Sequence, residues 1–228
     1  RDVIVGKITQ AGEVPAYSWV PPGLPGYEQQ TLDAKNMKQA EREAMAKKLY
    51  KEAGYGPDKP LKLEILYNTS DNHKKIAVAV QNMWKKVLGV DATLTNQEWK
   101  VYLNTRKTKS FDVARAAWIG DYMDPYTFLQ MFLSTAGDQN DAGYNSQKYD
   151  ADLMTAQKTV DQPARLKVLQ DAEKTFLDDY AMIPIYHYNT KHLVSKKVKG
   201  WDFNLLDIHL ERPSLETLFI SLTGRKLE

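Results

Sequence analysis

Strand-like and helix-like patterns of hydrophobic positions alternate along most of this chain. Residues 61–67 (Leu-Lys-Leu-Glu-Ile-Leu-Tyr) alternate and then become continuously apolar, as strands do, whereas 72–88 repeat apolar residues at helical spacing. Strands are predicted at 61–67, 90–96, 111–118 and 182–188. Helices are predicted at 33–53, 72–88, 98–107, 124–133, 148–159 and 163–180. This order, with short connections, predicts an α/β fold with a mixed, mostly parallel sheet flanked by helices.

Capping residues support several of these boundaries. Asp33 is expected to cap the first helix, which Gly54 ends, and Gly89 ends the second. Asp124-Pro125 is expected to begin another helix, with proline at its first position.

The two ends of the chain have a different character. The first thirty residues are rich in proline and glycine but also carry Tyr17, Trp19 and Tyr27, so they are expected to form an ordered coil packed on a surface. From Asn189 onward the pattern changes to short strands and turns around Trp201, which fits a different structural unit.

Composition narrows the function classes. The 31 basic and 29 acidic residues give a formal net charge of +2, and this balance argues against a nucleic-acid partner. The basic stretch Lys191–Lys199 is expected to be a solvated hairpin or loop. The absence of cysteine excludes disulfides and thiolate metal sites and fits an oxidising compartment. No apolar run approaches the roughly 20 residues that span a membrane.

The chain is expected to be a fragment. Arg1-Asp-Val-Ile-Val5 reads like the middle of a larger protein, and no signal peptide precedes it. The closing Leu227-Glu228 could be a cloning remnant.

Common catalytic and metal-binding patterns are not found in this sequence. The histidines lie too far apart for a metal site, and there is no phosphate loop or activated nucleophile. Asp178 and Asp179 diverge on a helix and are expected to be solvated surface residues. No catalytic residue, metal or cofactor is therefore predicted. The four histidines are His73, His187, His192 and His209.

Charged and aromatic residues gather near the ends of two predicted strands, where open α/β sheets bind ligands. Arg115 lies on the strand 111–118, Trp118 ends that strand, and Asp121 and Tyr122 follow it. A cavity with anionic and cationic anchors and aromatic walls suits a zwitterion with variable side chains, which describes a peptide. Alternatively, Arg115 and Asp121 form only an intramolecular salt bridge beneath packed tryptophans.

Several motifs resemble the periplasmic oligopeptide-binding proteins of ABC importers. The resemblance covers about residues 1–195 and is loose beyond Lys197, through Val198-Lys-Gly-Trp201. The motifs are Arg1-Asp-Val-Ile-Val5, Ala53-Gly-Tyr55, Leu66-Tyr-Asn-Thr-Ser-Asp71, His73-Lys-Lys75, Asn96-Gln-Glu-Trp99, Phe111-Asp-Val-Ala-Arg115, Trp118 and Asp121-Tyr122.

The resemblance implies roles for individual residues. Asp121 would bind the α-ammonium of a peptide, and a cationic set would receive its carboxylate, with the residue used depending on peptide length. The cationic set is Arg106, Arg115 and His73. Trp99 would line a side-chain pocket, and Trp118 and Tyr122 would flank the anchor. Ile119 departs from the small or polar residue expected there, which leaves the first pocket's shape open.

The resemblance also implies a two-lobed protein of Venus-flytrap type. Residues 1–188 would form its distal, C-terminal lobe, a type II periplasmic-binding-protein lobe, and 189–228 would return across the hinge into the missing N-terminal lobe. Peptide would be enclosed between the lobes and passed to membrane permease subunits, in the periplasm. Open alternatives are a carrier of murein peptide, dipeptide, haem or metal chelate, a peptidase, and an interaction module.

Overall fold

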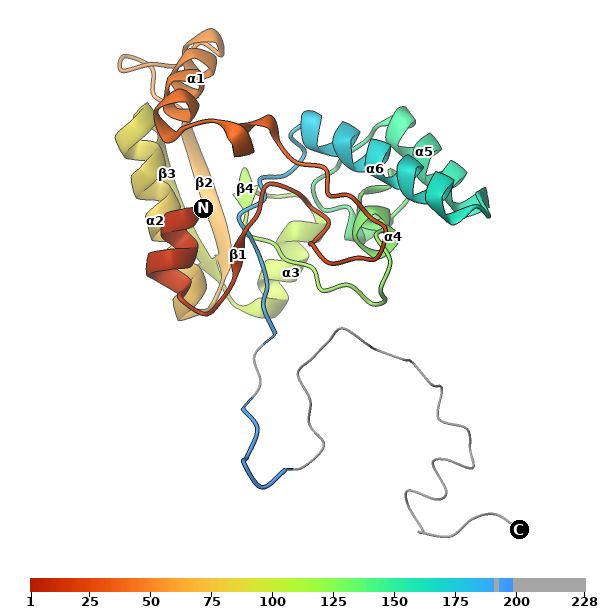
Figure 1. The fold of residues 1–228 in the computed structure, drawn as a ribbon. Helices are drawn as coiled ribbons and strands as arrows, with labels where there is room; N and C mark the ends of the chain where they lie inside the picture. The colour runs from red at the N-terminus through yellow and green to blue at the C-terminus, as the bar shows by residue number, and fades with distance from the viewer. Residues whose placement is uncertain (191–192, 199–228) are drawn as a thin grey trace, which may run out of the picture. The chain divides into compact units, whose positions relative to one another are not determined.

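A computed structural model describes residues 1–190 and 193–198 of the chain (Figure 1). The chain divides into a compact unit, Arg1–Asn189, and a second segment, Thr190–Glu228. All the described helices and strands lie in the first unit. The expectations for His192, His209, Trp201 and Leu227-Glu228 concern residues outside the described part. No described helix is both long and apolar enough to cross a membrane.

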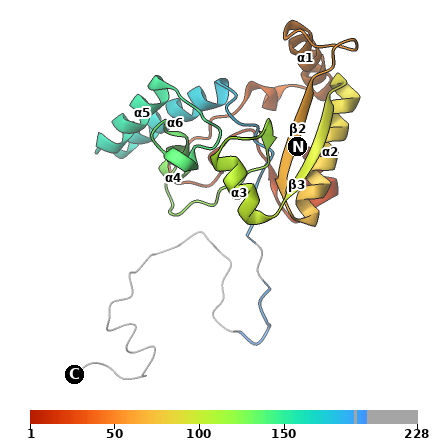
Figure 2. The same ribbon diagram turned by 180° about the vertical axis from the view of Figure 1, so that it is seen from behind.

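A three-stranded parallel sheet forms one half of the compact unit. Its strands are β2 (Lys62–Asn68), β3 (Asp91–Gln97) and β4 (Val113–Ala114), in the order β3-β2-β4. Helix α2 (Asp71–Leu88) lies on one side of the sheet and α3 (Trp99–Lys107) on the other, as both views show (Figures 1 and 2). The predicted α/β class with a mostly parallel sheet flanked by helices is confirmed.

The local sequence explains why these elements form where they do. The side chain of Ser70 accepts a hydrogen bond from the His73 N–H at the start of α2, and Gly89 ends the helix with a φ of 77°. The apolar face of α2 packs on the two longer strands around Ile65, Ala77 and Ala92. The predictions for 61–67, 72–88, 90–96 and 98–107 agree with these elements to within a residue or two.

Two predicted strands are much shorter than expected. The strand predicted at 111–118 is reduced to Val113–Ala114 with one further ladder bond at Arg115, because Trp118 then packs against a separate, helical core. The strand predicted at 182–188 is reduced to β5 (Tyr186–His187), which pairs antiparallel with β1 (Val14–Pro15) outside the parallel sheet. Pro184 lacks an N–H donor and so cannot extend this strand inward.

The first predicted helix is also divided. Asp33 does not cap it but begins a 3₁₀ turn, Asp33–Asn36, and α1 spans Gln39–Glu52 after an extended break. The new start is stabilised by the Glu41 carboxylate, which accepts a hydrogen bond of 2.7 Å from the Lys38 N–H. No side chain of α1 is buried.

The other half of the unit is helical. It contains α4 (Tyr126–Leu129), which continues as a 3₁₀ turn (Gln130–Phe132), a short 3₁₀ turn (Gly137–Gln139), α5 (Gln147–Lys158) and α6 (Gln162–Asp178). Pro125 stands at the N-cap of α4 and not at its first helical position. Side chains from α4, α5 and α6, including Leu129, Leu153 and Phe176, form the apolar core of this half.

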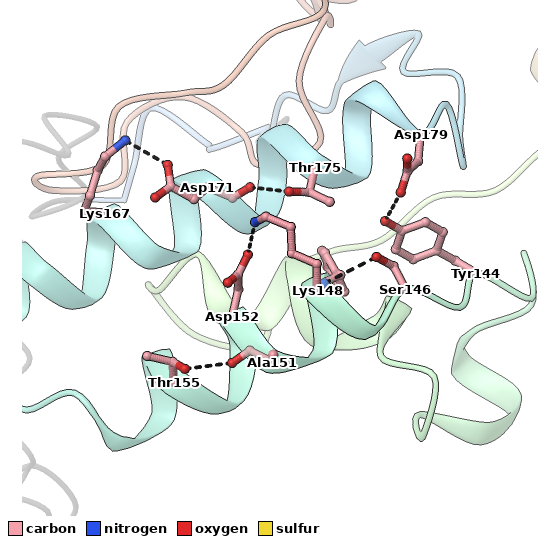
Figure 3. A network of polar contacts seen from close by, with 11 residues as sticks. Tyr144, Ser146, Lys148, Ala151, Asp152, Thr155, Lys167, Asp171, Thr175 and Asp179 are labelled. Carbon is pink, nitrogen blue, oxygen red and sulfur yellow. Dashed lines mark hydrogen bonds and ion pairs between the residues drawn. The ribbon is translucent and has the colours of Figure 1, made fainter.

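One polar contact joins the segment before α5 to the end of α6, and the other contacts drawn in Figure 3 lie within one helix or at its cap. The Tyr144 hydroxyl, just before α5, donates a hydrogen bond of 2.6 Å to Asp179 at the end of α6. Asp178 pairs with Lys174 one turn earlier. Both aspartates are exposed, as expected, and each has an intramolecular partner.

The N-terminal coil is anchored on α6 by one buried carboxylate. Glu173 is fully buried. Its Oε1 accepts the N–H groups of Trp19 and Val20 at 2.9 and 2.8 Å, and its Oε2 accepts the Tyr27 hydroxyl at 2.7 Å and the Gln30 N–H at 3.2 Å. These bonds satisfy three backbone N–H groups and one hydroxyl of the coil, which lie outside any strand or helix that could pair with them. The expected ordered coil is therefore confirmed. The first thirty residues also include a short π-helix, Ile4–Thr9.

Replacing Glu173 by alanine should destabilise the protein strongly. We expect Glu173→Ala to lower the free energy of unfolding at pH 7 by about 3 kcal/mol or more, since several buried donors would lose their acceptor. Urea unfolding followed by circular dichroism measures this change. Glu43→Ala, on the exposed surface of α1, is the matched control and should cost less than about 0.5 kcal/mol. Equal effects of the two substitutions would contradict the anchoring role.

The charge of Glu173 should also make stability depend on pH. Burial raises the pKa of its carboxyl from 4.5 to about 7, although the hydrogen bonds from the coil oppose the rise. The folded state thus holds this proton more tightly, so the group favours folding most below about pH 4.5 and progressively less up to pH 7. Relative to Glu173→Gln, the wild type should lose up to about 3 kcal/mol across this range. Parallel pH profiles of the two proteins would refute this.

Candidate functional site

The parallel strands of the sheet end at one common edge, and three of the predicted site residues lie along it. His73 is in the first turn of α2, which follows β2; Trp99 begins α3, which follows β3; and Arg115 comes directly after β4. Ligands of open α/β sheets bind outside this carboxyl edge. The short connections of the sheet are what bring these residues together.

Arg115 extends the edge of the sheet and carries an available charge. Its N–H donates to the Leu66 carbonyl at 2.8 Å, which continues the ladder beyond β4. Its guanidinium donates a hydrogen bond to the Tyr188 hydroxyl, a neutral group. Within residues 1–190 and 193–198, no carboxylate pairs with Arg115. Its positive charge is therefore not neutralised by any residue that the structure describes.

His73 lies close enough to Arg115 for the two to interact electrostatically. Burial lowers the pKa of the His73 imidazole, and the neighbouring Arg115 guanidinium lowers it further. A lowered pKa favours the neutral ring at pH 7, so His73 can donate a hydrogen bond but carries little charge there.

Arg106, unlike Arg115, already has an acidic partner. It forms an ion pair with Asp141, and the two side chains are only 16% and 15% exposed. The guanidinium also lies over the Tyr102 ring, 5.4 Å from its centroid. Asp141 lies in the loop between the 3₁₀ turn Gly137–Gln139 and α5, and the sequence offered no signal that this loop would reach α3.

The aromatic residues differ in how they are used. Trp99 is half exposed and stacks on Tyr102, with 5.8 Å between the ring centroids. Trp118 is partly buried against the helical core, and its Nε1 is buried with no hydrogen-bond acceptor among the described residues. Tyr122 and Ile119 are exposed. Ile119 has 76% of its surface accessible, so it does not fill a cavity within the compact unit.

Asp121 stands on a segment that is firmly held at its backbone. Its N–H donates to the hydroxyl of buried Thr127 at 3.0 Å. Gly120 lies so close to Phe128 that an added Cβ would be 2.7 Å from the ring. The Asp121 side chain is exposed, and it forms no ion pair with Arg115 in the described structure. The alternative of a simple internal Arg115–Asp121 salt bridge is therefore wrong.

A second carboxylate in the same segment is neutralised. Asp124 receives two hydrogen bonds from Arg165, at 2.6 and 2.8 Å, and one from the Tyr126 N–H at 2.8 Å. Sequence reasoning missed this pair because Arg165 lies far along the chain, in α6. Asp121 is left as the carboxylate of this segment without an ion-pair partner among the described residues.

His187 has a structural environment. Its Nε2 lies 3.1 Å from the Ser18 hydroxyl, and burial lowers the pKa of its ring. It lies on β5, outside the parallel sheet.

Comparison with known proteins identifies the family. Residues 1–140 match the family described as bacterial extracellular solute-binding proteins, family 5 Middle. The chain belongs to this family. The expected resemblance to periplasmic peptide-binding proteins of ABC importers is thereby confirmed.

Individual relatives of this family 5 chain agree in sequence and in structure. It is 43% identical over 204 residues to the periplasmic murein peptide-binding protein MppA of Escherichia coli, and 43% identical over 201 residues to the periplasmic oligopeptide-binding protein OppA of Salmonella typhimurium. These alignments cover 90% and 88% of the chain but only 38% and 37% of the relatives. The chain thus spans less than two fifths of their length.

A solved structure supports the same fold. The crystal structure of Haemophilus influenzae OppA in complex with RPPGFSPFR superimposes with a TM-score of 0.78 at 37% identity. The match covers 82% of this chain and 37% of that one. The family 5 chain therefore has the fold of part of a periplasmic binding protein.

Breaking the Asp124–Arg165 pair should cost measurable stability. We expect Asp124→Asn to lower the free energy of unfolding by about 1–2 kcal/mol at pH 7, because a bidentate, partly buried ion pair is lost. Burial alone would raise the pKa of Asp124, but Arg165 and the Tyr126 N–H lower it below 3.8. The carboxylate therefore stabilises the fold above about pH 3.8, and the difference should shrink as the pH falls through its folded pKa.

Chemical denaturation at pH 7 and pH 3 tests this. Asp171→Asn removes an exposed i,i+4 pair with Lys167 and is the control, with an expected cost below about 0.5 kcal/mol. Equal costs for both variants would show that the Asp124 pair has no special weight.

Proposed function

We propose that this chain is one lobe of the substrate-binding component of an ABC importer, which captures oligopeptides between two lobes and delivers them to membrane permease subunits. One observation carries the proposal: Asp121, an exposed carboxylate, follows a sheet edge that bears Arg115, and neither has an ion-pair partner among the described residues. Peptides are zwitterions, and these are the two charges that fixing their ends requires. The similarity to oligopeptide- and murein-peptide-binding relatives supports the same assignment.

All the predicted site residues except Arg106, which is paired with Asp141, have a role in this proposal. Asp121 binds the peptide's α-ammonium, and Arg115, assisted by His73, receives the carboxylate. A charge-assisted hydrogen bond of this kind contributes roughly 1.5–3 kcal/mol. Trp99, Trp118 and Tyr122 form apolar walls that accept many side chains. The assignment is to binding and not to catalysis.

The proposal includes a missing partner lobe. Residues 1–188 form the distal lobe, and 189–228 return across the hinge; the compactness of Arg1–Asn189 supports this division. Peptide bound to one lobe gains contacts with the other and shifts the equilibrium toward the closed state. The site of action is the periplasm, as the names of the relatives suggest.

A murein peptide is the second candidate ligand. The chain is as similar to the murein peptide-binding protein of Escherichia coli as to the oligopeptide-binding protein of Salmonella typhimurium, at 43% identity each. Mass spectrometry of the ligand that co-purifies with the complete protein separates the two candidates.

Blocking a peptide's amino group should weaken binding to the complete protein. Calorimetry with a tripeptide and its N-acetylated form is expected to show a loss of about tenfold to a hundredfold on acetylation, because the charge partner of Asp121 is removed. Asp121→Asn should weaken the free tripeptide and reduce the difference between the two forms. Asp152→Asn, which removes a carboxylate from α5 that pairs with Lys148, is the control and should change neither affinity. Equal affinities for both peptides in the wild type would refute the role of Asp121.

A further inference from the structure

The ion pair between Arg106 and Asp141 competes with the ligand-binding role expected of Arg106. Arg106 belongs to the set of side chains expected to receive a peptide carboxylate, yet Asp141 already occupies its guanidinium. Both side chains are about 15% exposed, so solvent screens this pair much less than a surface pair. A ligand carboxylate could reach Arg106 only by displacing Asp141 or by lying beside a second negative charge.

The loop that carries Asp141 is built to keep it in place. The neighbouring Asn140 is buried, and its side chain donates to the carbonyls of Leu133 and Tyr144 at 3.1 and 2.7 Å. The Asn140 side chain also accepts the Tyr144 N–H at 3.0 Å. A second ion pair, Lys107–Asp138 at 3.0 Å, joins the same loop to the end of α3. Asp141 therefore does not depend on Arg106 alone for its position.

Arg115 provides the contrast within the same set. Its partner is the neutral Tyr188 hydroxyl, and a ligand carboxylate can replace that contact without meeting a like charge. The two arginines lie on different elements, one in the last turn of α3 and one after β4. In the role that the family resemblance implies for this cationic set, the residue that a peptide's carboxylate meets depends on the length of the peptide.

We infer that Asp141 is a specificity-determining residue that withdraws Arg106 from ligand binding and so narrows the range of accepted peptide lengths. This inference rests on the proposed function. Peptides whose carboxylate reaches Arg115 bind well, and those whose carboxylate would fall at Arg106 are disfavoured by the charge of Asp141. Rejection by a fixed like charge is a common way to obtain specificity.

A length series in the complete protein tests the inference. Calorimetry with di-, tri-, tetra- and penta-alanine is expected to show that Asp141→Asn raises the affinity for one length by about tenfold and leaves the preferred length within about twofold. Adding Arg106→Gln to that variant should abolish the gain. If Asp141→Asn does not fold, Asp141→Ser also removes the charge and carries the same expectation.

Asp138→Asn is the matched control, since it removes the same charge from the same loop but from an exposed pair. It should change every affinity by less than about twofold. An unchanged length profile in Asp141→Asn, or an equal gain at all lengths, would overturn the inference while leaving the proposed function standing. If the wild type bound no peptide of any length, both would fall.

Discussion

The arrangement of the compact unit depends on the hydrogen bonds that the buried Glu173 carboxylate accepts. These bonds, from the N–H groups of Trp19 and Val20, hold a proline-rich coil on α6, and this coil in turn contacts the segment that carries Asp121. The indole N–H of the same Trp19 donates to the Phe128 carbonyl, and the Phe128 ring packs under Gly120, next to Asp121. A continuous set of contacts thus links a buried acid in the helical half to the exposed acid of the candidate site.

Several charged groups near the site are neutralised by a partner in the same compact unit. The pairs are Asp124 with Arg165, Arg106 with Asp141, and Lys107 with Asp138. Asp121 and Arg115 differ, because no oppositely charged side chain among the described residues pairs with either. Leaving these two charges uncompensated has a cost when they are desolvated, and in the proposed function a zwitterionic ligand would remove that cost. The proposal therefore does not need a large net charge, because two single charges would hold the two ends of a peptide.

Local patterns were sufficient for part of the fold. Hydrophobic periodicity and the Gly89 cap predicted β2, α2 and β3 well, because these elements are long and the cap is next to its helix in sequence. The strand expected at 111–118 stopped at Ala114 because Trp118 packs in the helical core, a tertiary effect that alternation does not reveal. The contacts of the candidate site also include tertiary ones that local patterns do not reveal. Strand ends indicated Arg115 and the aromatic residues, whereas Asp141 and Arg165 reach the site from loops and helices far away in sequence.

We propose that Asp121 and Arg115, which have no ion-pair partner among the described residues, fix the two ends of a peptide. A crystal structure of the complete protein with a bound peptide tests this proposal. We expect the peptide's α-ammonium within hydrogen-bond distance of the Asp121 carboxylate and its C-terminal carboxylate on Arg115, with Arg106 still paired with Asp141. A peptide whose ammonium lies away from Asp121 and whose carboxylate contacts neither arginine would contradict it.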